Sequence, residues 1–258
     1  MSMSTREPQF YGYDLLASQA RSLKGRLIVL EGTDGVGRSS QIALLREWLE
    51  NEGYAVATSG LKRGKLAGKG LKEAMSGHTL GDTTMNLLYA TDLADRMERE
   101  ILPALRAGFI MLTDRYIYSL IVRSLVRGAD PRWIKNLFSF ALVPDIVFYL
   151  QADVEFLVTR VLNARGFDYW ESGGDFLRGR DYYDNFVDYQ RRVLAQFDAI
   201  SDQYDFHRID ANRSMHEVFK DLQSAIRTVI ADMKPAHPPI ASRPAGDGGA
   251  PSGGAASG

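Results

Sequence analysis

The stretch RLIVLEGTDGVGRSS, residues 26–40, joins a short apolar run to three closely spaced glycines. The run RLIVLE predicts a buried β-strand, because four apolar residues in succession leave no face for water. Gly32, Gly35 and Gly37 allow the positive φ angles that curl backbone N–H groups around an anion. The stretch fits the phosphate-binding pattern G-x-x-x-x-G-K-[ST] at every position except Arg38. We therefore expect a phosphate-binding loop, although an ordinary glycine-rich turn is the alternative.

The loop predicts binding of ATP and Mg²⁺. Ser39 supplies the hydroxyl expected to ligate the metal ion, and the helix that starts near Arg38 directs its unpaired amides at phosphate. Arginine keeps the charge of the usual lysine but is longer and planar, so ATP binding should survive better than phosphoryl transfer. The residues expected to contact ATP here are Gly32, Thr33, Asp34, Gly35, Val36, Gly37, Arg38, Ser39 and Ser40.

Apolar runs and amphipathic segments alternate along the rest of the chain. Parallel strands are predicted at residues 26–31, 54–58, 109–113, 145–150 and 206–209. Helices are predicted at residues 39–52, 83–107, 131–141, 154–164, 184–203 and 215–232. This alternation indicates an α/β fold, a five-stranded parallel sheet flanked by helices, whose ligands lie at the carboxyl ends of the strands.

Composition narrows the class of protein. Lys and Arg number 31 against 32 Asp and Glu, so no overall field favours nucleic acid or an anionic membrane. There are no cysteines, which excludes thiol chemistry and suits a reducing cytosol. The first residues lack a signal-peptide core and no later apolar run could span a bilayer, so we expect a cytoplasmic protein.

The two ends of the chain differ from the middle. Residues 1–24 form an N-terminal extension whose amphipathic piece, residues 13–23, could pack as a helix on the domain or on a second subunit. Residues 25–232 form the main domain. Residues 233–258 are rich in Gly, Ala, Pro and Ser and are predicted to be a disordered tail.

Several motifs resemble those of the thymidylate kinase family. Residues 31–41, EGTDGVGRSSQ, are similar to that family's phosphate loop, and Asp114-Arg115-Tyr116 is similar to its D-R-[YFH] motif. Residues 87–92, LLYATD, resemble its acceptor-site helix. Residues 160–171 resemble its arginine-bearing lid, and residues 209–211 resemble the strand that leads to its adenine-side loop.

The resemblance implies a P-loop nucleoside-monophosphate kinase with a role for each matching residue. Arg38, Arg115, Asp34 and the lid residue Arg165 are the expected catalytic residues. Asp114, Arg115 and Tyr116 are expected to bind substrate, and Asp114 is expected to help organise Mg²⁺. Ala211 is expected beside the adenine. An Asp114–Arg115 surface pair and a plain solvated loop at residues 164–181 are the structural alternatives.

The sequence departs from the family pattern at positions that are expected to bind the acceptor phosphate. The family has an arginine at the position of Leu93, and Arg96, four residues after Asp92 on nearly the same helix face, is the expected replacement for binding the acceptor phosphate. The basic stretch around Lys62, Arg63 and Lys65 could supply that contact instead, or be only a soluble loop.

These residues together favour ATP-dependent phosphorylation of a nucleoside monophosphate, with dTMP the acceptor that the resemblance implies. The resemblance also implies a homodimer. Two alternatives remain: a nucleotide-binding module with little turnover, because of Arg38 and Leu93, and a kinase of the same fold with another nucleotide or nucleoside acceptor.

Overall fold

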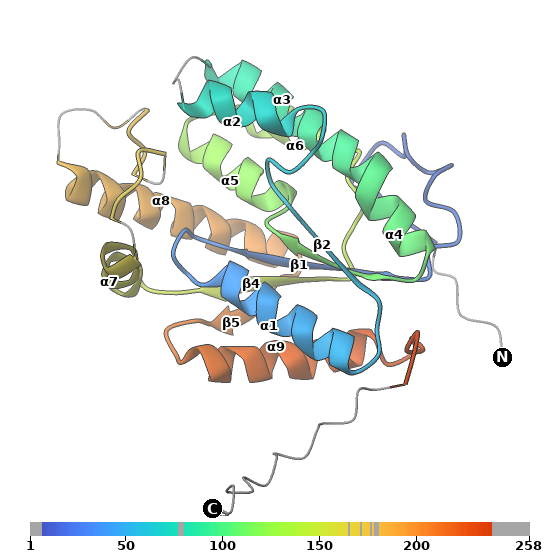
Figure 1. The fold of residues 1–258 in the computed structure, drawn as a ribbon. Helices are drawn as coiled ribbons and strands as arrows, with labels where there is room; N and C mark the ends of the chain where they lie inside the picture. The colour runs from blue at the N-terminus through green and yellow to red at the C-terminus, as the bar shows by residue number, and fades with distance from the viewer. Residues whose placement is uncertain are drawn as a thin grey trace, which may run out of the picture.

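The computed structural model describes residues 7–76, 80–164, 166–170, 172–175, 177 and 181–238 (Figure 1). Its strands are β1 (Arg26–Gly32), β2 (Val56–Gly60), β3 (Ile110–Asp114), β4 (Ile146–Gln151) and β5 (His207–Asp210). Its helices are α1 (Arg38–Asn51), α2 (Gly68–Ser76), α3 (Asp82–Arg96), the π-helix η1 (Met97–Ile101), α4 (Leu102–Arg106), α5 (Ile117–Val126), α6 (Pro131–Leu137), α7 (Val154–Ala164), α8 (Tyr182–Gln203) and α9 (Met215–Val229).

The sheet is parallel and has the strand order β2-β3-β1-β4-β5. All seven residues of β1 are buried, as expected for the middle strand of a sheet covered on both faces. Because the strands are parallel, the ends of β1 and β3 lie side by side, with Leu30 paired to Asp114. The predicted α/β class is confirmed, and each predicted strand lies within two residues of its expected position.

Alternating residues of β1 enter two separate cores. Leu27 and Val29 pack with residues of α3, α5 and α8 on one face. Ile28 and Leu30 pack with residues of α1, α7 and α9 on the other, and these two groups of helices lie on opposite sides of the sheet in Figure 1. None of the described helices is long and apolar enough to cross a membrane.

The structure corrects the sequence reading of the helices in two places. α5 was not predicted, although it follows Tyr116 directly. Residues 68–76, for which no helix was predicted, form α2. By contrast, the predicted helix at residues 83–107 is present as one helical run, α3, η1 and α4.

The N-terminal segment belongs to the main domain. Residues 13–23 form turns rather than the predicted helix, yet Leu16, Ala20 and Leu23 are buried in the same core as residues of α3 and α5. The backbone of Phe10 forms an antiparallel bridge with Leu142. The start of the predicted tail is also packed, since Ala236 N donates to Gly53 O at 2.8 Å. Residues 239–258 of that predicted tail lie outside the described residues.

Candidate active site

The glycine-rich loop connects β1 to α1 at the carboxyl edge of the sheet. Gly32, Gly35 and Gly37 have φ angles of 141°, 83° and 100°, values that L-residues with a Cβ adopt only under strain. A Cβ on Gly32 would also lie 2.7 Å from the carbonyl oxygen of Leu150 on β4. The glycines are therefore required by both the turn and the close packing against β4.

Arg38 folds onto the loop instead of extending into solvent. Its Nη1 donates to the carbonyl oxygen of Gly32 at 2.7 Å and to that of Thr33, while its Nε lies 2.9 Å from Asp114 Oδ1. The other oxygen of Asp114 accepts from Ser39 Oγ at 2.7 Å. Burial alone would raise the pKa of Asp114, but Arg38 and Ser39 outweigh it and hold that pKa below its usual value.

Asp34 lies at the tip of the loop and pairs with two arginines: Arg115, which lies just before α5, and Arg123 within it. Its Oδ1 contacts Arg115 Nη2, and its Oδ2 lies 2.5 Å from Arg123 Nη2. Burial would raise the pKa of Asp34, but the two guanidinium groups hold it well below the usual range. Arg115 has a φ of 68°, so it is held in a left-handed conformation that few non-glycine residues adopt.

Glu31 fixes the start of α5 beneath these arginines. It is fully buried, and its Oε1 accepts from Tyr116 N at 2.7 Å and from Ser119 N at 3.2 Å. Burial raises its pKa, although hydrogen bonds from Ser119 and Tyr116 oppose the effect. A residue of the central strand thus orients the helix that follows Arg115 and carries Arg123.

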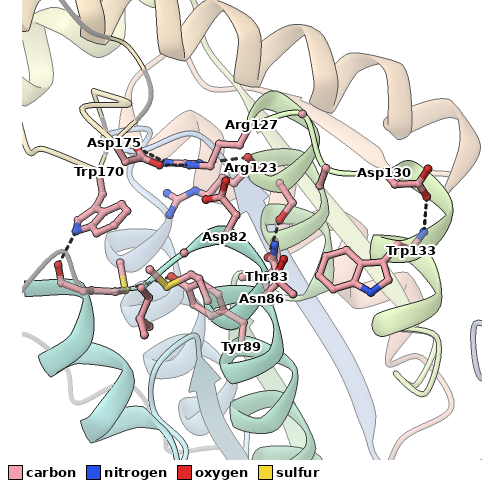
Figure 2. Close-up of a pocket in the computed structure, with 18 of the residues that line it drawn as sticks. Asp82, Thr83, Asn86, Tyr89, Arg123, Arg127, Asp130, Trp133, Trp170 and Asp175 are labelled. Atoms are coloured by element: carbon pink, nitrogen blue, oxygen red, sulfur yellow. Dashed lines mark hydrogen bonds and ion pairs between the residues drawn. The ribbon is translucent and has the colours of Figure 1, made fainter.

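Two adjoining hollows open beside Asp34. The inner hollow, about 500 Å³, lies against Asp34, Asp114 and Arg115. The outer hollow, about 630 Å³, lies between α3 and α5 (Figure 2). The residues that line both are Met75, Tyr89, Arg123, Tyr169 and Trp170. The hollows therefore form one continuous cleft, and Arg123 lies at their junction.

The inner hollow carries an excess of positive charge. Among the residues that the structure describes, its charged lining consists of five cations and three carboxylates, a formal charge of five minus three, or +2. These residues are Lys62, Arg63, Lys72, Arg115, Arg123, Asp34, Asp114 and Asp168. Burial, followed by the charges of Arg123 and Arg115, lowers the pKa of Lys62, as expected where cations crowd together.

A segment between α7 and α8 covers the cleft. Asp175 accepts two hydrogen bonds from Arg127 of α5, at 2.6 Å from Nε and 3.0 Å from Nη2. Trp170 Nε1 donates to Met75 O of α2 at 3.2 Å. On the other flank of the phosphate loop, Arg160 Nη1 donates to Val36 O at 3.4 Å. The predicted lid residue Arg165, with Arg178 and Arg180, lies outside the described residues.

Comparison with known proteins matches this arrangement to one family. A family model described as thymidylate kinase matches residues 30–222. The chain belongs to the thymidylate kinase family.

Three curated relatives of the thymidylate kinase family illustrate the similarity. A probable thymidylate kinase 2 of Saccharolobus solfataricus is 36% identical over 212 residues, 81% of this chain and 97% of the relative. A probable thymidylate kinase of Thermococcus kodakarensis is 29% identical over 80% of this chain and 98% of its own length. A thymidylate kinase of Brachyspira hyodysenteriae is 30% identical, with coverage of 80% and 95%.

The structure corrects two of the predicted substrate contacts. Arg96 is fully buried, pairs with Asp92 at 2.9 Å and donates to Ser59 Oγ at 3.3 Å, and it lines neither hollow. Tyr116 is equally buried, and its hydroxyl donates to Leu142 O at 3.0 Å. Both side chains lie in the core, and neither lines the cleft in this conformation.

Other predicted residues lie together at the carboxyl edge of the sheet. Asp114 ends β3, beside the loop that bears Arg38 and Ser39. Ala211 follows β5 and donates through its N–H to Gln151 O at 2.7 Å, at the end of β4. Their contacts with ATP remain predictions.

Sequence reasoning missed Arg123 because the helix that carries it was not predicted. The spacing held a signal, since Arg115, Ser119, Arg123 and Arg127 recur every four residues and would share one face of a helix. Arg123 replaces Arg96 as the candidate for the acceptor phosphate.

Proposed function

We propose that the chain transfers the terminal phosphoryl group of ATP to dTMP, giving ADP and dTDP. A phosphate oxygen of dTMP attacks the γ-phosphorus of ATP, and the bond from that phosphorus to the β–γ bridging oxygen breaks. The observation that carries the proposal is the inner hollow, whose charge of +2 suits a phosphate dianion and which adjoins the phosphate loop.

Each group near the loop has a place in this reaction. The loop amides and Arg38 hold the β- and γ-phosphates, and Arg160 lies close enough to the loop to reach the donor. Arg115 and Arg123 neutralise charge on the transferring and acceptor groups. Asp34 contacts no phosphate directly but holds both guanidinium groups in place.

The residues present also fit Mg²⁺. A serine hydroxyl and a carboxylate lie 2.7 Å apart at Ser39 and Asp114, and this magnesium-type oxygen pair faces the loop. No cluster of three or more carboxylate or imidazole ligands occurs among the described residues, so phosphate oxygens would complete the coordination. When bound, Mg²⁺ offsets the negative charge of the donor phosphates.

A coupled assay of ADP release against several nucleoside monophosphates tests the proposal. We expect release with dTMP that depends on both ATP and Mg²⁺. Absence of release with every acceptor, despite measurable ATP binding, would favour a nucleotide-binding module, for which Arg38 held by Gly32, Thr33 and Asp114 is the supporting observation. Release with other acceptors but not dTMP would change only the substrate.

A further inference from the structure

Asn86 is a buried polar side chain of α3 that lines the outer hollow one helical turn before Tyr89, next to Asp82 and Thr83 of the same helix. Figure 2 shows Asn86 and Tyr89 across the hollow from Arg123 and Arg127 of α5. Only 6% of Asn86 is exposed, so its amide has little access to bulk water. A buried amide of this kind needs hydrogen-bond partners, because an unmade bond costs about 1–3 kcal/mol.

Ser124 of α5 fixes the orientation of this amide. Its Oγ donates to Asn86 Oδ1 at 2.7 Å, and the serine itself is only 5% exposed. The bond occupies one lone pair of Oδ1. The amide nitrogen donates to no protein atom within the part of the chain that the structure describes. Asn86 therefore presents an N–H donor and, beside it, a remaining oxygen lone pair.

The charges of the cleft determine which part of a nucleotide reaches Asn86. The inner hollow, with its +2 charge, takes the phosphate, and Arg123 marks the junction between the two hollows. The outer hollow then takes the base. Tyr89 and Trp170, which line both hollows, supply the aromatic surface that a flat base requires.

We propose that Asn86, oriented by Ser124, is the specificity-determining residue for the acceptor base, an inference that rests on the proposed function. Its donor and acceptor match a base that carries a carbonyl oxygen next to a ring N–H, the edge that thymine and uracil present among pyrimidines and guanine among purines. Cytosine carries an amino group next to an unprotonated ring nitrogen. It would place donor against donor and acceptor against acceptor.

The hydrogen bond from Ser124 favours the orientation of the Asn86 amide that suits thymine or uracil. If the amide turned over to suit cytosine, its NH₂ group would face the serine hydroxyl, which would have to accept that bond and find another acceptor for its own proton. Sites built on such hydrogen bonds discriminate strongly, because the wrong ligand leaves buried polar groups unpaired.

The test compares dTMP with dCMP in two measurements on the full chain: calorimetric affinity and kcat/KM for ADP release. Asn86→Asp replaces the donor with a second acceptor, and we expect it to lower the dTMP-to-dCMP ratio by at least about 10²-fold in both. Ser124→Ala, which frees the amide to turn, should lower the ratio by about tenfold. Asn136→Asp, an exposed asparagine of α6, is the matched control and should leave the ratio unchanged.

Ratios within about threefold of the wild-type value in both Asn86→Asp and Ser124→Ala would overturn the assignment. If Asn86→Asp does not fold, as judged by circular dichroism, Asn86→Ala and Ser124→Ala decide the question. Calorimetry separates this proposal from the proposed function. A protein that binds dTMP selectively through Asn86 without releasing ADP would refute the kinase activity and keep the role of Asn86.

Discussion

Asp34 is the residue on which the arginines of the site converge. One buried carboxylate holds the guanidinium groups of Arg115 and Arg123, which would otherwise repel each other. Removing one member of such a buried group leaves charges without partners, and this costs more than the interaction itself contributes.

Asp34→Asn should lower the free energy of unfolding by about 3 kcal/mol near pH 7. The unfolded carboxyl titrates at 3.8 and the folded one lower, so the stabilisation is present above pH 3.8 and is lost as pH falls toward the folded pKa. The stability difference between wild type and variant should therefore shrink below that pH, as chemical denaturation over a pH series would show. Asp205→Asn, at an exposed aspartate, is the control; a difference independent of pH would contradict the assigned pKa shift.

Arg115→Ala should lower kcat at least about 10²-fold, because it removes a charge that stabilises the transferring group. The KM for ATP should change much less, since the loop amides and Arg38 remain. Arg46→Ala, which disrupts only an exposed pair with Glu50, provides the comparison in the same ADP-release assay. A rate close to wild type would remove Arg115 from the mechanism.

The motifs in the sequence predicted which residues lie together at the site. The sequence did not show which of the predicted side chains are buried in the core. Arg38, Asp114 and Arg115 could be placed together because each follows a predicted strand end. Arg96 could not be judged, because helical spacing gives the face of a residue but not what that face packs against. Here the shared face of Asp92 and Arg96 packs against Ser59 and the backbone of residues 62–64.

α5 is the element that links the parts of the site. It begins directly after Tyr116, carries Arg123 and Ser124, and ends beside Arg127. The sequence predicted strands and long helices well because their apolar periodicity is strong. It failed at α5, a short helix whose first two turns are almost wholly buried and apolar, so the few polar residues on its one polar face were not recognised as a helical pattern.

The Arg127–Asp175 pair attaches the covering segment to α5. Its two hydrogen bonds, together with the Tyr189 hydroxyl at 2.8 Å, hold the guanidinium in one geometry. Asp175→Asn should raise the KM for dTMP about tenfold, equivalent to about 1.4 kcal/mol, because the roof of the outer hollow would lose its attachment. The KM for ATP should be unaffected.

Arg127→Lys should behave similarly, because lysine keeps the charge but cannot form the two-pronged contact. Glu50→Gln, in an exposed pair, serves as control. An unchanged KM for dTMP in both variants would show that the segment is held by other contacts, such as that between Trp170 and Met75.

The molecule as a whole includes its N-terminal segment. Leu16 is 6% exposed and Leu15 is 73% exposed. Because the two residues are neighbours of the same type, a difference between their variants measures the effect of burial. Leu16→Ala should lower the free energy of unfolding by about 2–3 kcal/mol, whereas Leu15→Ala should change it by less than about 0.5 kcal/mol. Urea denaturation of both variants measures the difference. Equal effects would mean that the segment is not packed on the core in solution.

The strand order has a consequence for how the chain is made. β1 is synthesised first yet occupies the centre of the sheet, where Val29 pairs with Thr113 and Ile28 with Ile146. At translation rates of 5–20 residues per second, the time between synthesis of the apolar stretch LIVL of β1 and synthesis of β4 is on the order of ten seconds. Until β3 and then β4 follow, the two edges of this apolar strand lack their partners, and such an unpaired edge is prone to aggregation.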